Sequence, residues 1–265
     1  MNLQSVGGLL LRHLFLYTRN WIRPIELVFW PLMDLLVIGY LMVFLQQKTA
    51  GDFPQFLRFL LGAVIFWDVL FRSQQAVAIS FLEDVWTRNL LNIFAAPIRI
   101  SEYLTATFAL GLIRITLTVV LLATVARLLY AFNLLEFKWS LLPFLVNLLL
   151  FGWSLGMVST ALIIRWGQAA ESLAWAIPFL VQPLAAVFYP LEVLPRWMQW
   201  LAASLPCTYV FEGMRAVLAS DQLAQRQMVL ATALNALWLA GTAWFFLFMF
   251  KQARTKGLLT KVATQ

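Results

Sequence analysis

The sequence predicts an all-α integral membrane protein that crosses the bilayer six times. Of its 265 residues, 62% are apolar and only 12% are charged, which is far more apolar than an ordinary soluble domain. The apolar residues form separate runs that can cross a hydrocarbon core of roughly 30 Å at about 1.5 Å per residue. The basic residues, which give a net charge of +7, gather at the ends of these runs. We therefore expect them to meet anionic lipid headgroups and no nucleic acid.

The chain starts with an expected surface helix and two spans. Residues 1–24 mix leucines with Arg12, His13 and Arg19, which is the composition of a basic amphipathic helix in the cytoplasmic interface. Residues 27–45 are the first expected span, and a polar turn leads to the second, residues 55–80. The first apolar run continues past signal-peptide length, so no cleavable signal peptide is expected.

A polar break follows the second run, and residues 83–98 within it are expected to form a short helix on the membrane surface. Its apolar residues recur at helical spacing and make one stripe, while Asp84 and Arg88 lie one turn apart on the other side. Pro97 ends the helix. Its candidate residues are Glu83, Asp84, Trp86, Arg88, Leu90, Ile93 and Phe94. This helix either docks a soluble partner on its free face or is an interfacial loop helix without a partner.

The next three apolar runs, residues 103–130, 141–164 and 173–189, are the third to fifth expected spans. Gly152 and Gly156 have the spacing that lets another helix approach closely, and we expect the glycines at 111 and 241 to serve close packing as well. Prolines at 178 and 183 should kink the fifth span.

Residues 191–219 hold two apolar segments that are too short to span and are divided at Pro206. We expect a re-entrant or interfacial pair of helices on the outer side. Its candidate residues are Trp197, Trp200, Pro206, Tyr209, Glu212 and Arg215. Residues 228–250 are the sixth span, and a basic tail follows. Lysine and arginine are more numerous on the side of the termini, which places both termini and residues 83–98 in the cytoplasm.

Four ionisable residues fall inside the expected spans: Asp34, Asp68, Arg72 and Arg114. Burying one of them unpaired at mid-bilayer costs roughly 2.5 to 3.5 kcal/mol, so each should face protein or water. Asp34 and Arg72 lie at similar depths in neighbouring antiparallel spans and are expected to meet. Asp68 shares a helix face with Arg72, and Arg114 would complete the network. The network is either a polar wall of a translocation path or a structural clamp.

Sequence motifs for catalysis are mostly absent from this chain. It contains no GxSxG, no HExxH and no Gly-x-x-x-x-Gly-Lys-Ser/Thr phosphate loop. The single cysteine, Cys207, and the single histidine, His13, exclude a multi-cysteine metal site and leave little for imidazole catalysis. We expect neither an enzyme nor a bound cofactor, and any ATP must be bound by another polypeptide.

The order of these parts resembles the membrane subunits of ABC-2 type exporters, a group that includes polysaccharide, lipo-oligosaccharide and some drug exporters. The resemblance covers essentially the whole chain. Glu83-Asp84 through Ala96-Pro97-Ile98 looks like the family's cytoplasmic coupling segment. Leu194-Pro195-Arg196-Trp197 through Glu212-Gly213-Met214-Arg215 looks like its re-entrant helical pair. Asp-Val-Trp-Thr-Arg follows Glu83 where many drug-exporting relatives carry a Gly-Thr pair, which weakens a drug assignment.

The resemblance implies a half-transporter in a bacterial cytoplasmic (inner) membrane. Two copies of this permease would form the pore, with the first and fifth spans at their interface. Two copies of an ABC ATPase, which binds ATP and Mg²⁺, would dock beneath. The cargo would be amphipathic or lipid-linked, for which a glycan is one expectation. The alternatives are an ion-coupled secondary transporter that uses the intramembrane charges, and a multidrug or sodium-type ABC-2 efflux permease.

Overall fold

The computed structural model describes residues 2–19, 22–48, 54–87, 89–220 and 224–256. Within these ranges the chain consists of helices and short turns without a strand, so the all-α prediction is confirmed. Arg88 and the end of the basic tail, from residue 257 on, lie outside the described residues.

The described part of the chain forms ten α-helices and three short 3₁₀ helices. The α-helices are α1 (Leu3–Arg19), α2 (Ile22–Lys48), α3 (Pro54–Trp86), α4 (Leu90–Ala95), α5 (Ile100–Tyr130), α6 (Leu141–Trp166), α7 (Glu171–Leu184), α8 (Arg196–Ala203), α9 (Pro206–Ser220) and α10 (Gln225–Thr255). The 3₁₀ helices are η1 (Leu134–Ser140), η2 (Gly167–Ala170) and η3 (Leu191–Val193).

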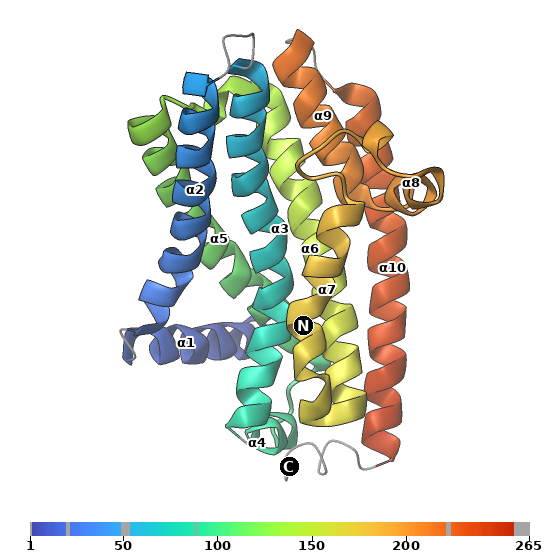
Figure 1. Ribbon diagram of the computed structural model, residues 1–265. Coiled ribbons are helices and arrows are strands. Elements are labelled where there is room, and N and C mark those ends of the chain that lie inside the picture. The colour runs from blue at the N-terminus through green and yellow to red at the C-terminus, as the bar shows by residue number, and fades with distance from the viewer. Residues whose placement is uncertain (1, 20–21, 49–53, 88, 221–223, 257–265) are drawn as a thin grey trace.

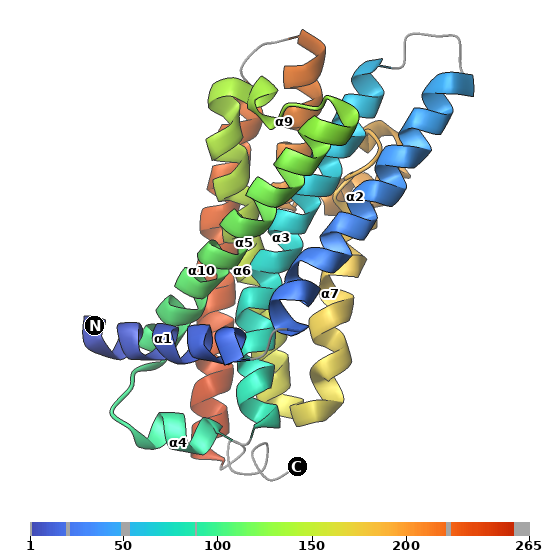
Figure 2. The same ribbon diagram turned by 90° about the vertical axis from the view of Figure 1, so that its left-hand side faces the viewer.

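The long helices α2, α3, α5, α6 and α10 build one elongated bundle (Figure 1). We call the end that carries α1 and α4 the lower end, and the end at which α2 stops and α3 starts the upper end. Helix α1 lies across the lower end, nearly perpendicular to the bundle, and α4 lies beyond it (Figure 2). Helix α8 projects from the side of the upper half, and α9 rises to the upper end (Figure 1).

Among the described helices, four segments are long and apolar enough to cross a membrane: Pro24–Lys48, Ile100–Tyr130, Leu134–Trp166 and Gln225–Thr255. They correspond to the first, third, fourth and sixth expected spans. Helix α3 has the length but carries more charge, and α7 has only 14 residues. The chain is therefore a multi-pass membrane protein, and the count of six crossings stays a prediction.

The predicted close approach at Gly152 and Gly156 is confirmed, and the partner helix is α3. A Cβ atom at Gly152 would lie 2.3 Å from the Cβ of Ser73, and one at Gly156 would lie 2.7 Å from the Cβ of Val77. A Cβ atom at Gly111 of α5 would likewise lie 2.6 Å from the Cβ of Ala76 on α3. Helix α3 is thus the central helix, and α5 and α6 pack closely on it at positions where glycine has no side chain. The expectation for Gly241 was wrong, because a Cβ there would meet nothing within 4 Å.

Buried amide side chains add polar links between these helices. Gln74 of α3 donates to Ser159 Oγ of α6 and to the Ala174 carbonyl of α7, both at 2.9 Å. Asn235 of α10 donates to Asn147 Oδ1 of α6 at 2.8 Å. Because an unsatisfied polar group in hydrocarbon costs several kcal/mol, these bonds also fix how the helices are rotated against each other.

The fifth expected span and the expected surface helix differ from their observed bounds. The fifth span was expected at residues 173–189, but α7 ends at Leu184, directly after Pro183. The chain then turns through Ala186, which has a positive φ of 52°. The surface helix expected at residues 83–98 is not one helix, because α3 continues through Trp86 and only the six residues of α4 follow. Its predicted end is correct, since Ala96 is extended before Pro97.

Candidate coupling region and intramembrane charges

Asp84 joins the three helices that meet at the lower end. It lies in the last turn of α3 and is 1% exposed. Arg12 of α1 donates through Nη2 to Asp84 Oδ1 at 2.5 Å. Tyr103 of α5 donates through its hydroxyl to Asp84 Oδ2 at 2.8 Å. Both carboxylate oxygens are thus occupied, one of them by a charge-assisted hydrogen bond, which is the stronger kind.

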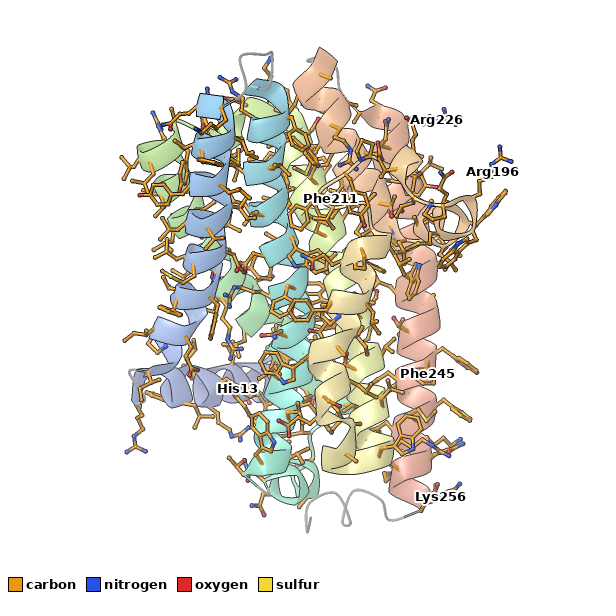
Figure 3. The ribbon with its side chains drawn as sticks, in the orientation of Figure 1. His13, Arg196, Phe211, Arg226, Phe245 and Lys256 are labelled. Atoms are coloured by element: carbon orange, nitrogen blue, oxygen red, sulfur yellow. The ribbon has the colours of Figure 1, made fainter. Side chains whose placement is uncertain are left out.

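Hydrogen bonds also attach the start of α1 to the start of α5. Glu102 accepts from the backbone N–H of Asn2 at 2.6 Å and from that of Arg99 at 3.0 Å. On the same side of α1, Leu9 and His13 are spaced by one turn and are both buried. Figure 3 shows His13 on the inner part of α1, next to the bundle. The amphipathic helix expected at residues 1–24 is therefore packed on the bundle along one face, with Leu3, Leu11 and Phe15 exposed.

The expected coupling residues are divided between two helices. Glu83 and Asp84 are buried in α3, whereas Trp86 is exposed and donates to Glu171 Oε2 of α7 at 3.2 Å. Ile93 of α4 is buried against the lower core, which includes Phe81 and Tyr103. Arg88 and the side chains of Leu90 and Phe94 lie outside the described residues. The acidic start of the segment thus faces the protein, because Arg12 and Tyr103 supply partners for it there.

Helix α4 offers the free surface of this region. Asn92 and Ala95 are exposed on it, and Pro97 is exposed after it. Figure 2 shows α4 below α1, at the lower extreme of the molecule. The α3–α4 connection is short, since Asn89 N–H donates to the carbonyl of Asp84 at 2.9 Å. A force on α4 therefore acts within a few residues of the Asp84 carboxylate.

In the middle of the bundle, the charges of α3 pair within their own helix. Arg72 Nε donates to Asp68 Oδ2 at 2.9 Å and to Oδ1 at 3.0 Å, and the two side chains are only 12% and 11% exposed. Asp34 and Arg72 lie close enough to interact electrostatically, but no hydrogen bond or ion pair joins these two described residues. Asp68 occupies the guanidinium from one turn away, and Asp34 is exposed on α2. Arg114 is buried on α5, and its place in the network stays a prediction.

At the upper end, Glu212 and Arg215 of α9 fasten the turn that follows α7. Glu212 Oε1 accepts from the Leu191 N–H and from Arg215 Nη2, both at 2.9 Å. Arg215 Nη2 also donates to the Ala186 carbonyl at 2.7 Å, and its guanidinium lies 4.5 Å from the ring centroid of Phe59 on α3. The predicted charged residues of the outer pair thus connect α9 to α3.

The remaining outer residues mark the α8–α9 corner. Pro206 begins α9, and Tyr209 donates to the carbonyl of Ala203 at the end of α8, at 3.0 Å. Trp197 and Trp200 are exposed on α8. Two short helices therefore occur where they were expected, and their re-entrant role in the membrane stays a prediction.

Sequence reasoning missed Tyr103 and Gln74. Both are polar groups inside apolar runs, and that is the signal that would have found them, since such groups need partners in other helices. Within the described part of the chain, no three histidine, cysteine or acidic side chains gather as metal ligands would.

Comparison with known proteins identifies this arrangement. The family model of the ABC-2 type transporter matches residues 4–219, a stretch from α1 through most of α9. The chain belongs to the ABC-2 type transporter family. This ABC-2 protein is also similar to ABC transporter G family member 20 of Dictyostelium discoideum, with 29% identity over 145 residues. The aligned part is 53% of this chain and 19% of that protein, so the match covers about a fifth of the relative's length.

Proposed function

We propose that this chain is the membrane-spanning subunit of an ATP-driven exporter in a bacterial cytoplasmic membrane. In this proposal two copies form the path, and each docks on a separate ATPase subunit that binds ATP and Mg²⁺. The cargo is amphipathic or lipid-linked, such as a lipid-linked glycan. Membership of the ABC-2 family supports the transporter class. The aromatic side chains exposed on α8 and α10 suit such a cargo, although they suit membrane lipid equally well.

The Asp84 contacts carry the coupling part of the proposal. Helix α4 is the docking element, and it follows α3 directly after a carboxylate that binds α1 and α5 as well. Movement of α4 by an ATPase would therefore be passed to three helices together. A loop helix without such contacts would move alone and transmit nothing. The buried Asp84 serves the transmission, and the exposed residues of α4 serve the docking.

The test is a photo-crosslink from α4 in the native membrane. A benzophenone amino acid replaces Asn92, which is exposed on α4, and in a matched variant it replaces Leu135, which is 67% exposed on η1 at the upper end. We expect Asn92 to capture a polypeptide that contains a Gly-x-x-x-x-Gly-Lys-Ser/Thr loop, identified by mass spectrometry, and Leu135 not to capture it. No such polypeptide at Asn92, or equal capture at both positions, contradicts the proposal.

The charges inside the bundle favour a second candidate, an ion-coupled transporter that works without an ATPase. Its support is the Asp68–Arg72 pair together with the exposed Asp34 on α2, since ionisable residues in spans often mark ion pathways. Transport by the purified protein in liposomes, driven by an ion gradient without nucleotide and lost in Asp34→Asn, would favour this candidate. The ATP-driven exporter predicts no transport in that experiment.

A further inference from the structure

One exposed face of α10 carries a polar hollow and an apolar hollow in succession. Arg226, Leu230, Leu234, Leu237 and Gly241 follow each other at intervals of three and four residues, so they lie on the same side of the helix. All of them are exposed except Leu234, which is half-buried. The first two line the upper hollow, and the other three line the lower one.

The upper hollow has a volume of about 340 Å³ and contains charges of both signs. Its walls are the turn Pro190–Glu192, Tyr209 and Glu212 of α9, and Arg226, Gln227 and Leu230 of α10. Glu212 already binds Arg215 and the Leu191 N–H. Glu192 and Arg226 are both exposed, and neither makes a hydrogen bond or ion pair with another described residue. Among the described residues, one anion and one cation of this hollow are thus available to a ligand.

The lower hollow has a volume of about 410 Å³ and offers apolar surface. It is lined by Ser204, Leu234, Leu237, Trp238, Gly241 and Thr242. The polar groups among these are engaged with the protein. Trp238 Nε1 donates to the Ser204 carbonyl at 2.9 Å, and Thr242 Oγ1 donates to the Trp238 carbonyl at 2.7 Å. Ser204 Oγ donates to the Leu201 carbonyl at 2.6 Å. Because α10 is a membrane-span candidate, an outward apolar hollow on it faces hydrocarbon.

The two hollows together extend over about the depth of one lipid leaflet. From Arg226 to Gly241 the helix rises about 22 Å at 1.5 Å per residue. Half of a hydrocarbon core is about 15 Å, and the headgroup region adds several ångströms. Trp197 and Trp200 are exposed on the neighbouring α8, as in an interfacial aromatic belt. Figure 3 shows Arg196 and Arg226 on the same upper side, pointing away from the bundle.

We propose that this face of α10 binds one molecule of phosphatidylethanolamine. Arg226 binds the phosphate, Glu192 binds the ammonium group, and one acyl chain fills the apolar hollow beside Gly241. Glu192 disfavours an anionic headgroup such as phosphatidylglycerol. A choline headgroup has no N–H to donate to the carboxylate. The site does not depend on an ATPase, so it goes beyond the transport function proposed above.

The test is native mass spectrometry of the delipidated protein in detergent with phosphatidylethanolamine, phosphatidylglycerol or phosphatidylcholine of identical acyl chains. We expect one bound phosphatidylethanolamine per chain at concentrations at which the other two lipids bind roughly fivefold less, which is about the effect of one exposed charge contact. Glu192→Gln should remove this preference. Gly241→Trp should fill the lower hollow and reduce the binding of phosphatidylethanolamine at least as much.

The matched control is Ala236→Trp, which adds the same volume to an exposed position on another side of α10 and should leave binding unchanged. Leu237 lines the same hollow. The change Leu237→Asn makes the hollow less apolar without adding volume, so this variant replaces Gly241→Trp if Gly241→Trp does not fold. Equal binding of the three lipids by the wild type, or equal effects of Gly241→Trp and Ala236→Trp, overturns the proposal. A dimer in the same spectra that only Gly241→Trp or Leu237→Asn dissociates would assign this face to a second copy, which also overturns it.

Discussion

Asp84 determines how the lower end of the bundle holds together. Loss of its charge would leave the Arg12 guanidinium without a carboxylate partner. Removing one partner of a fully buried ion pair destabilises a protein by roughly 3 to 5 kcal/mol. Because the Arg12 side chain is 29% exposed and can reach water, we predict that Asp84→Asn lowers the free energy of unfolding by about 1 to 3 kcal/mol. Tyr103→Phe removes one hydrogen bond and should cost about 1 kcal/mol. Thermal unfolding in one detergent measures both.

Glu26→Gln is the control for these variants, since Glu26 is an exposed carboxylate near the lower start of α2. It should unfold like the wild type. A double variant, Arg12→Ala with Asp84→Asn, should cost less than the sum of the two single changes, because both remove the same contact. Strict additivity, or an Asp84→Asn protein as stable as the wild type, would show that the contact does not stabilise the fold.

Single residues differ in how far the sequence could place them. Asp68 and Arg72 are one helical turn apart, so their shared face followed from spacing alone. Asp84 has partners 72 and 19 positions away in the chain, and they meet only because α1 folds across the bundle. No local pattern contains that information. Equal depth in two spans placed Asp34 near Arg72, but it does not determine how the two helices are rotated, and Arg72 bonds Asp68 of its own helix instead.

The contact between α3 and α6 depends on glycines that leave no room for a side chain. We predict that Gly152→Ala lowers the free energy of unfolding by about 1 to 3 kcal/mol, the usual range for overpacking. Its Cβ atom would lie 2.6 Å from the backbone oxygen of Leu70, which cannot move without shifting α3. Gly241→Ala is the matched control on α10. It should be neutral or stabilise by up to about 1 kcal/mol, because alanine favours helix.

Chemical denaturation of both variants in one detergent makes this comparison. Equal effects of Gly152→Ala and Gly241→Ala would mean that the helices shift freely, contrary to the close contact in the structure. The sequence predicted the Gly152 contact because small residues spaced by four positions lie on one face. The same rule failed for Gly241, since a lone glycine in a span does not tell which side of the helix meets protein.

Helix boundaries were predictable where a residue forces them and not elsewhere. Pro97 forces Ala96 out of the helical region, and α4 ends there as expected. Between Ser80 and Trp86 no glycine or proline interrupts α3, although the charges in this stretch predict the start of a new element. The helix continues because Asp84 finds partners in α1 and α5. Charge alone therefore does not end a helix when other helices can bind it.

The contacts of α3 at its two ends bear on the number of crossings in the whole bundle. Arg58 near its start pairs with Glu136 of η1 at 3.4 Å, at the upper end. Trp86 at its end donates to Glu171 of α7, at the lower end. Between these points α3 follows α6, which is a span candidate, through Gly152 and Gly156. A helix that contacts both ends of a spanning helix must cross the same layer, so we infer that α3 crosses the membrane.

We propose that helices α7 and α9 together make the remaining crossing. Helix α7 rises from the lower end and stops partway, and α9 continues to the upper end, where α10 begins (Figure 1). The break between them is held by Arg215, which binds the Ala186 carbonyl. Broken helices are tolerated at membrane depth when protein satisfies their free backbone groups. In this arrangement Arg165 and Gln225 lie on opposite sides of the membrane, as do Gln47 and Asn92.

Cysteine labelling of intact cells tests this topology, since all four positions are exposed. The native Cys207 is fully buried, so it should stay unlabelled and each introduced cysteine can be followed alone. We predict that a membrane-impermeant maleimide labels Gln47→Cys and Gln225→Cys in intact cells, but Asn92→Cys and Arg165→Cys only after permeabilisation. Labelling of Gln47→Cys and Asn92→Cys from one side would mean that α3 does not cross, and α4 would then lose its cytoplasmic position. Labelling of Arg165→Cys and Gln225→Cys from one side would instead make α7 and α9 a re-entrant pair. Helix α10 would then start on the cytoplasmic side and end outside, which contradicts the cytoplasmic carboxyl terminus that the basic residues favour.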